Sequence, residues 1–189
     1  KVEFEVNSKL QIIENMAFSS TNINTINIPA TVTKICYGAF TNCYNLQNVE
    51  IPINSRLKII ENYAFRETKI ESIYIPEGVT ELGETFCSET KHLTKIFVSP
   101  KNKRFSYNDD KYLVGKTDNT SKVFDVLLFA RNDIVEAIIP FDIKIIGLNA
   151  FYSCKKLQKV IFSENSNLQK IDQHAFFLSG ITEISIPAS

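Results

Sequence analysis

The sequence predicts a repeat solenoid, a β-rich coil with a parallel sheet on one face and short turns or helical turns on the other. Two observations carry this prediction. A segment that ends at Phe18 is nearly repeated in the segments that end at Phe65 and Phe176. Two dipeptides, Ala-Phe and Ile-Pro, also recur along the chain. Each such repeat can bury its apolar side only against its neighbours, so the repeats must stack.

Each repeat contains one strand pattern, apolar-x-x-apolar-x-apolar, as in Ile70, Ile73 and Ile75. The last two apolar positions alternate with the period of two that places them on one face of a strand. Pro76 follows directly, and proline ends a strand's hydrogen-bond ladder because it has no N–H to donate. We therefore expect about eight strand rungs, each closed by an Ala-Phe turn.

The phenylalanine of the Ala-Phe turn holds a fixed place in each repeat. We expect Phe40, Phe65 and Phe151 to be buried along one spine, since a large apolar side chain at a repeated position fills the centre of the coil. Cys43 and Cys154 both follow such a phenylalanine at the third position, which is typical of a small buried residue.

The remaining cysteines and the histidines point to no metal site. Cys36 and Cys87 form no CxxC pair with the others, and His92 is isolated. We therefore expect four free thiols, no metal and no cofactor. His174 lies in an Ala-Phe turn at the place that Tyr63 occupies in another repeat, so we interpret it as a variable repeat position rather than a catalytic base.

Composition narrows the function classes further. Lys plus Arg and Asp plus Glu number 21 each, which gives no electrostatic reason to expect nucleic acid as a partner. No apolar run is long enough to insert into a membrane. The chain starts without Met and inside a repeat, so we expect it to be a piece of a longer array. No catalytic constellation or nucleotide-binding fingerprint occurs, and we predict that the chain is not an enzyme.

The motif from Thr33 to Leu46, TKICYGAFTNCYNL, resembles the BspA-like class of leucine-rich repeat proteins. The similarity covers nearly the whole chain apart from residues 101–130, and Asn102 to Val114 is similar to a degenerate insert of that family. The resemblance implies right-handed solenoid coils in a cell-surface or secreted protein that serves adhesion. A cytoplasmic location stays open as the alternative.

The residue between the last two inward positions of each strand should face outward. Stacked in order, this column reads Glu3, Asn27, Glu50, Tyr74, Phe97, Ile138, Ile161 and Ser185. Its middle is apolar, and exposed apolar patches mark partner sites. Tyr74, Phe97, Ile138 and Ile161 are therefore the candidate partner-binding residues, with Lys95 and Lys159 in a polar rim. Two alternatives stay open: the insert covers these residues, or the loops after each phenylalanine form the site.

Residues 101–130 break the repeat, and we interpret residues 1–189 as one solenoid domain with a hairpin-like insert there. The segments 112–114 and 126–129 are strand-like, and polar turn residues separate them. Asn119 begins an Asn-Thr-Ser sequon at the tip, which makes it a candidate glycosylation site.

These observations favour a non-enzymatic protein-binding or adhesion module that presents a repeat-built sheet surface. The partner expected is a protein or a glycan, for example on a host-cell surface or in extracellular matrix. The alternative is a structural spacer or scaffold segment of a longer surface protein.

Overall fold

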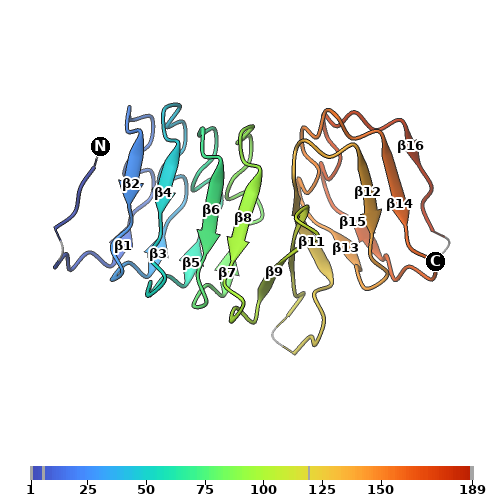
Figure 1. The fold of residues 1–189 in the computed structure, drawn as a ribbon, viewed down its shortest axis with the longest axis horizontal. Helices are drawn as coiled ribbons and strands as arrows, with labels where there is room; N and C mark the ends of the chain where they lie inside the picture. Colours follow the sequence, from blue (N-terminus) through green and yellow to red (C-terminus); the bar gives the residue numbers. More distant parts are fainter. Residues whose placement is uncertain (1, 6, 119, 188–189) are drawn as a thin grey trace. The chain divides into compact units, whose positions relative to one another are not determined.

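The computed structural model describes residues 2–5, 7–118 and 120–187, whose short β-strands pair mostly in parallel between successive coils (Figure 1). The described residues contain strands and turns and no helix, so turns rather than helical turns line the side opposite the long strands. The chain divides into two compact units, Lys1–Lys103 (unit 1) and Arg104–Ser189 (unit 2). Each is described by itself below.

Unit 1 contains two sets of strands. The outer set is β2 (Thr25–Asn27), β4 (Asn48–Glu50), β6 (Ser72–Ile75) and β8 (Lys95–Val98). The second set is β1 (Ile12–Ile13), β3 (Lys34–Ile35), β5 (Ile59–Ile60) and β7 (Glu81–Leu82). The second set forms one four-stranded parallel sheet, and the outer strands pair in parallel as β2–β4 and β6–β8. A single parallel bridge from Val2 to Ile26 occupies the place of a further outer strand.

The phenylalanines of the Ala-Phe turns stack on one another inside unit 1. The ring centroids of Phe18 and Phe40 are 5.3 Å apart, those of Phe40 and Phe65 are 5.4 Å apart, and both pairs are nearly parallel. Phe40 and Phe65 are fully buried, and the neighbouring Ala39 and Ala64 are buried as well. The predicted burial of the phenylalanine positions is therefore confirmed.

The backbone of the Ala-Phe turn takes an unusual conformation. The residue two places before the phenylalanine has a positive φ in five turns: Met16 (56°), Gly38 (58°), Tyr63 (60°), Asn149 (59°) and His174 (56°). Only one of these residues is glycine, the residue that adopts this region without steric cost. His174 thus occupies the same turn position as Tyr63, which confirms that it is a repeat position.

The four cysteines are free and buried, as predicted. Cys43 Sγ donates to the carbonyl oxygen of Phe18 at 2.9 Å, and Thr68 Oγ1 donates to that of Phe65 at 2.9 Å. The carbonyl that accepts from Cys43 belongs to the preceding coil, whereas the carbonyl that accepts from Thr68 belongs to the same coil. In both cases the third position after the phenylalanine holds a small donor that bonds to a phenylalanine carbonyl. Burial raises the pKa of the Cys154 thiol to about 12, so this thiol stays protonated near neutral pH.

Unit 2 begins with an antiparallel element and continues as a solenoid. Its strands are β9 (Phe105–Asn108), β10 (Tyr112–Gly115), β11 (Val126–Ala130), β12 (Glu136–Ile139), β13 (Ile145–Ile146), β14 (Lys159–Phe162), β15 (Lys170–Ile171) and β16 (Glu183–Ile184). Strands β12, β14 and β16 pair in parallel. The other sheet runs β15-β13-β11-β10-β9.

The break in the repeat is built into unit 2. Strands β10 and β11 pair antiparallel, as the hairpin interpretation requires, but β9 adds a strand that the sequence pattern did not predict. Strand β11 also pairs in parallel with β13 and so extends the solenoid sheet. Tyr112, Val114 and Leu127 lie in the same buried cluster as Phe151. The alternative in which this segment covers the outward sheet face is wrong, because these apolar residues fill the core and Ile138 stays 51% exposed.

Tyr112 has two roles in that core. Its ring lies edge-on to Phe151 with the centroids 6.3 Å apart, and Phe151 in turn stacks on Phe176 at 4.9 Å. Its hydroxyl accepts a hydrogen bond from the backbone N–H of Ile138 at 3.1 Å. Strand β12 is the first strand of its sheet, so Tyr112 satisfies a donor that would otherwise lack a ladder partner. Burial raises the pKa of Tyr112 to about 12.

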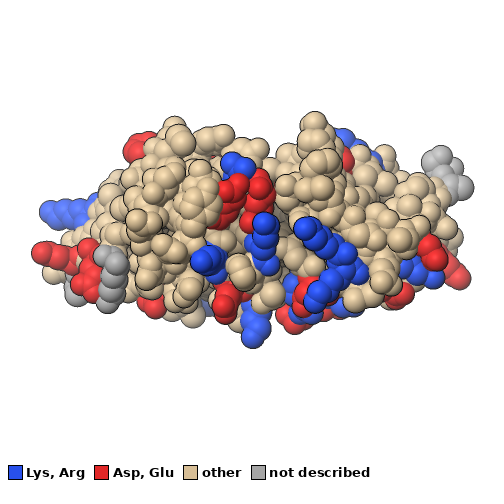
Figure 2. All heavy atoms as spheres, turned by 90° about the horizontal axis from the view of Figure 1, so that it is seen from above, with Lys and Arg blue, Asp and Glu red and all other residues tan. Residues whose placement is uncertain are grey.

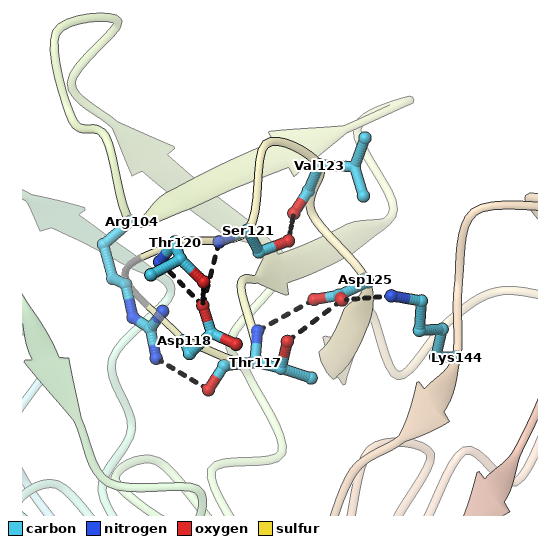
Figure 3. A network of polar contacts seen from close by, with 8 residues as sticks. All are labelled: Arg104, Thr117, Asp118, Thr120, Ser121, Val123, Asp125 and Lys144. Atoms are coloured by element: carbon cyan, nitrogen blue, oxygen red, sulfur yellow. Dashed lines mark hydrogen bonds and ion pairs between the residues drawn. The ribbon is translucent and has the colours of Figure 1, made fainter.

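A buried carboxylate fixes the loop between β10 and β11 (Figure 3). Asp125 is inaccessible to solvent and accepts hydrogen bonds from Thr117 N at 2.8 Å, Thr117 Oγ1 at 3.0 Å and Lys144 Nζ at 3.2 Å. Asp118 accepts bonds from the backbone N–H of Thr120 and Ser121 in the adjoining turn. Asn119, the candidate glycosylation site, lies outside the described residues.

Candidate interaction surface

The outward column of unit 1 is centred on two aromatic residues. Strands β6 and β8 pair in register, which sets Tyr74 beside Phe97. Their chain neighbours Ile73, Ile75 and Ile96 point into the core and are buried, whereas Phe97 is 56% exposed and Tyr74 is partly exposed. The alternation of a pleated strand therefore places these two rings on the outside, as the sequence predicts.

The start of the same strands supplies a polar border. Ser72 and Lys95 are register partners, and both side chains are exposed. Charged and hydroxyl groups at the edge of an apolar patch match the rim of a protein interface. Tyr74, Phe97 and Lys95 thus form one surface of unit 1, which we call the aromatic sheet face.

Unit 2 carries a second, aliphatic pair in the corresponding column. Ile138 of β12 is the register partner of Ile161 of β14, and Ile138 is the more exposed of the two. Glu136 and Lys159 pair one position earlier in each strand. Lys159 Nζ lies 3.8 Å from Glu183 of β16, and both side chains are largely exposed. The four predicted apolar residues therefore form two pairs, one in each unit.

A pocket that the sequence pattern did not single out lies in unit 1, on the loops that follow the phenylalanines. Its volume is about 320 Å³, and its lining includes Tyr44, Glu67, Lys69, Glu89, Lys91 and His92. Figure 2, seen from above the view of Figure 1, shows acidic and basic side chains gathered beside β6 and β8. The sequence does contain a sign of this pocket. The dipeptide Thr-Lys occurs as Thr68-Lys69 and again, one coil later, as Thr90-Lys91.

The described residues hold no group of three or more His, Cys, Asp or Glu side chains placed to bind a metal ion. Nor does this described part of the chain include a helix with the length and apolar character needed to cross a bilayer. The functional candidates are therefore the two sheet faces and the pocket.

Comparison with known families decides the assignment. The family model described as "BspA type Leucine rich repeat region" matches residues 2–109 and 121–189 in six copies. The chain belongs to the BspA-type leucine-rich repeat family. Among curated protein sequences, nothing matches the chain. The family match covers the aromatic sheet face and the pocket alike, so both are parts of one BspA-type repeat array.

Several solved structures share the fold of this chain. The pneumococcal vaccine antigen PcpA is 26% identical, with a TM-score of 0.88, over 97% of this chain and 44% of its own. A leucine-rich cell surface protein from Faecalibacterium prausnitzii is 28% identical, with a TM-score of 0.64, over 80% of this chain and 41% of its own. A leucine-rich repeat protein from Eubacterium ventriosum, 23% identical with a TM-score of 0.72 over 90% of this chain and 50% of its own, shares the fold. The chain thus spans half or less of these proteins.

Proposed function

We propose that this chain is a non-enzymatic recognition module that binds a protein or glycan partner through the aromatic sheet face. The observation that carries the proposal is the exposure of Phe97 beside Tyr74 on a regular parallel sheet. Aromatic side chains supply much of the binding energy at interfaces, because they bury a large area with little loss of conformational freedom. A rigid strand pair presents them without a large ordering cost.

The location we infer is a cell surface or the extracellular medium. Its support is the family and the two similar proteins whose names describe a vaccine antigen and a cell surface protein. Host-cell surfaces and extracellular matrix are the partner sources that fit such a location. The four free thiols are compatible with it, because all four are buried.

A spacer is the second candidate, and the stacked phenylalanines favour it. Repeated stacking of Phe18, Phe40 and Phe65 stiffens unit 1 independently of any partner. In that case the exposed rings would have no binding role, and their removal would leave adhesion unchanged.

Cell binding distinguishes the two functions. Fluorescently labelled chain is added to epithelial cells and to immobilised matrix, and bound protein is measured by flow cytometry and plate fluorescence. Saturable binding that a Phe97→Ala variant reduces supports recognition. Absence of saturable binding to either surface, or equal binding by the variant, supports the spacer. Ser72→Ala is the control, because it changes a side chain at the border of the same strand pair without removing an aromatic ring.

A further inference from the structure

The pocket on the post-phenylalanine loops of unit 1 has a firmly held floor. Thr68 Oγ1 and Thr90 Oγ1, from consecutive coils, both donate to the carbonyl oxygen of Phe65 at 2.9 Å. Both threonines are buried. One carbonyl oxygen thus joins the two loops. Lys69 and Lys91 directly follow the two threonines, so their backbone positions in adjacent coils are fixed as well.

The carboxylates of the pocket are already paired. Arg66 Nη2 donates to Glu67 Oε1 at 2.9 Å and to Glu89 Oε1 at 2.6 Å, while Arg66 Nε also donates to Glu89 Oε1 at 2.8 Å. A hydrogen bond to Glu67 raises the pKa of the Tyr44 hydroxyl. One guanidinium thus joins two acidic residues on adjacent coils and keeps their charges from repelling each other.

The basic side chains of the pocket are differently placed. In the described part of the chain, neither Lys69 nor Lys91 has a carboxylate within ion-pair distance. Adjacent coils of a parallel sheet are about 4.8 Å apart, so two ammonium groups carried at equivalent positions repel each other. An anion bound between them would relieve this repulsion. His92, next to Lys91 in the lining, offers a further polar contact.

Tyr44 adds a flat apolar wall. Tyr44 is 57% exposed, so its ring is available to a ligand. The C–H face of a sugar ring packs well against such a ring, and the free lone pairs of Glu67 and Glu89 can accept sugar hydroxyls. A volume of about 320 Å³ is at the small end of ligand sites and suits a single ring.

We propose that this pocket binds one carboxylate-bearing sugar residue, with its carboxylate between Lys69 and Lys91 and its ring against Tyr44. Two sources share this chemistry: a terminal sialic acid and a uronic acid of a polysaccharide. None of the residues that line this pocket belongs to the aromatic sheet face, so the proposal can be tested independently of the function proposed above.

Ligand titration followed by amide NMR tests the proposal on the whole chain. The probes are the methyl glycosides of N-acetylneuraminic acid and of glucuronic acid, with methyl galactoside and acetate as comparisons. At least one acidic glycoside should shift the amides of Lys69, Lys91 and His92 and bind about tenfold more tightly than either comparison. The acid that binds identifies the source. Equal binding of acetate or galactoside, or no shift with either acid, overturns the proposal.

Variants locate the contacts. Lys69→Gln combined with Lys91→Gln should weaken binding of the acidic glycoside about tenfold, and Tyr44→Ala should weaken it severalfold. All three side chains are exposed, so thermal unfolding should stay unchanged. Lys95→Gln removes the same charge on the aromatic sheet face and should leave sugar binding intact. Unaltered binding by the double lysine variant, or equal loss in Lys95→Gln, contradicts the site.

Discussion

The ring of Phe40 lies parallel to the ring of Phe65, with 5.4 Å between centroids and 1° between planes. Each ring comes from the Ala-Phe turn of its own coil, so the stack repeats the spacing of the backbone ladder inside the core. Turn, strand and core therefore share one register, which is why a short sequence motif can specify the coil.

Truncation of Phe65 tests this stack. Phe65→Ala removes a fully buried ring that stacks on Phe40 and should lower the free energy of unfolding by about 3–5 kcal/mol. Urea unfolding measures the loss. Phe97→Ala removes the same side chain from an exposed position of unit 1 and should cost less than about 1 kcal/mol. Equal losses in the two variants would show that the ring has no special role in the core.

Because some turn residues have a positive φ, substitution by glycine should have opposite effects on stability at two adjacent positions. Ser20 has a φ of 58°, whereas Ser19 does not have a positive φ, and the two residues are adjacent in one turn. Ser20→Gly relieves steric strain that exceeds the entropy cost of glycine, so we expect a gain of about 0.5 kcal/mol. Ser19→Gly should lose about 0.5–1 kcal/mol. Both variants lose the same weak Ser19–Ser20 hydroxyl contact, so the difference between their unfolding free energies isolates the backbone effect.

The repeat pattern predicted the strands, the buried phenylalanines and the outward place of Phe97, because period and turn chemistry are local. It could not predict how residues 101–130 join the stack. Phe105–Asn108 lacks a repeat signature, and its strand exists because β10 offers an antiparallel partner. The pocket was missed for a related reason: Arg66, Glu67 and Glu89 meet only when consecutive coils are set in register.

Removal of the Tyr112 hydroxyl tests whether this group stabilises the start of the solenoid in unit 2. Tyr112→Phe keeps the ring against Phe151 but leaves the backbone N–H of Ile138 without its acceptor. An unsatisfied donor at a partly buried position costs about 1–2 kcal/mol, and we expect that loss in urea unfolding. Tyr107→Phe, in the neighbouring strand β9, is the control, since no hydrogen-bond partner is found for its hydroxyl among the described residues. A neutral Tyr112→Phe would mean that Ile138 N–H is satisfied in another way.

Asp125 gives unit 2 a defined dependence on pH. Burial by itself would raise the pKa of this carboxyl, but the bonds from Thr117 and Lys144 outweigh burial and lower the pKa below its ordinary value of about 3.8. The stabilisation is therefore fully present above the unfolded-state pKa and is lost as the pH falls through the folded-state pKa. Asp125→Asn should cost about 2 kcal/mol at neutral pH, the typical loss for hydrogen bonds to a charged group.

The pH profile separates this effect from a general loss of packing. The difference in unfolding free energy between the wild type and Asp125→Asn should be constant from neutral pH down to about pH 5 and should shrink below about pH 4. Asp142→Asn removes a carboxylate from a partly exposed position and controls for net charge. A difference that stays constant down to the acid limit would contradict the role assigned to the Asp125 charge.

The affinity of a Tyr74→Ala, Phe97→Ala double variant for the partner captured from cells or matrix tests the recognition proposal most directly. Thermal unfolding first establishes that the variant keeps its fold, as the outward position of both side chains leads us to expect. The account predicts that the dissociation constant then rises at least tenfold, a loss of about 1.4 kcal/mol, while a charge swap at Lys69 in the post-phenylalanine loops leaves it unchanged. An unchanged dissociation constant in the double variant, together with loss of binding in the charge swap, would contradict the assignment of the aromatic sheet face.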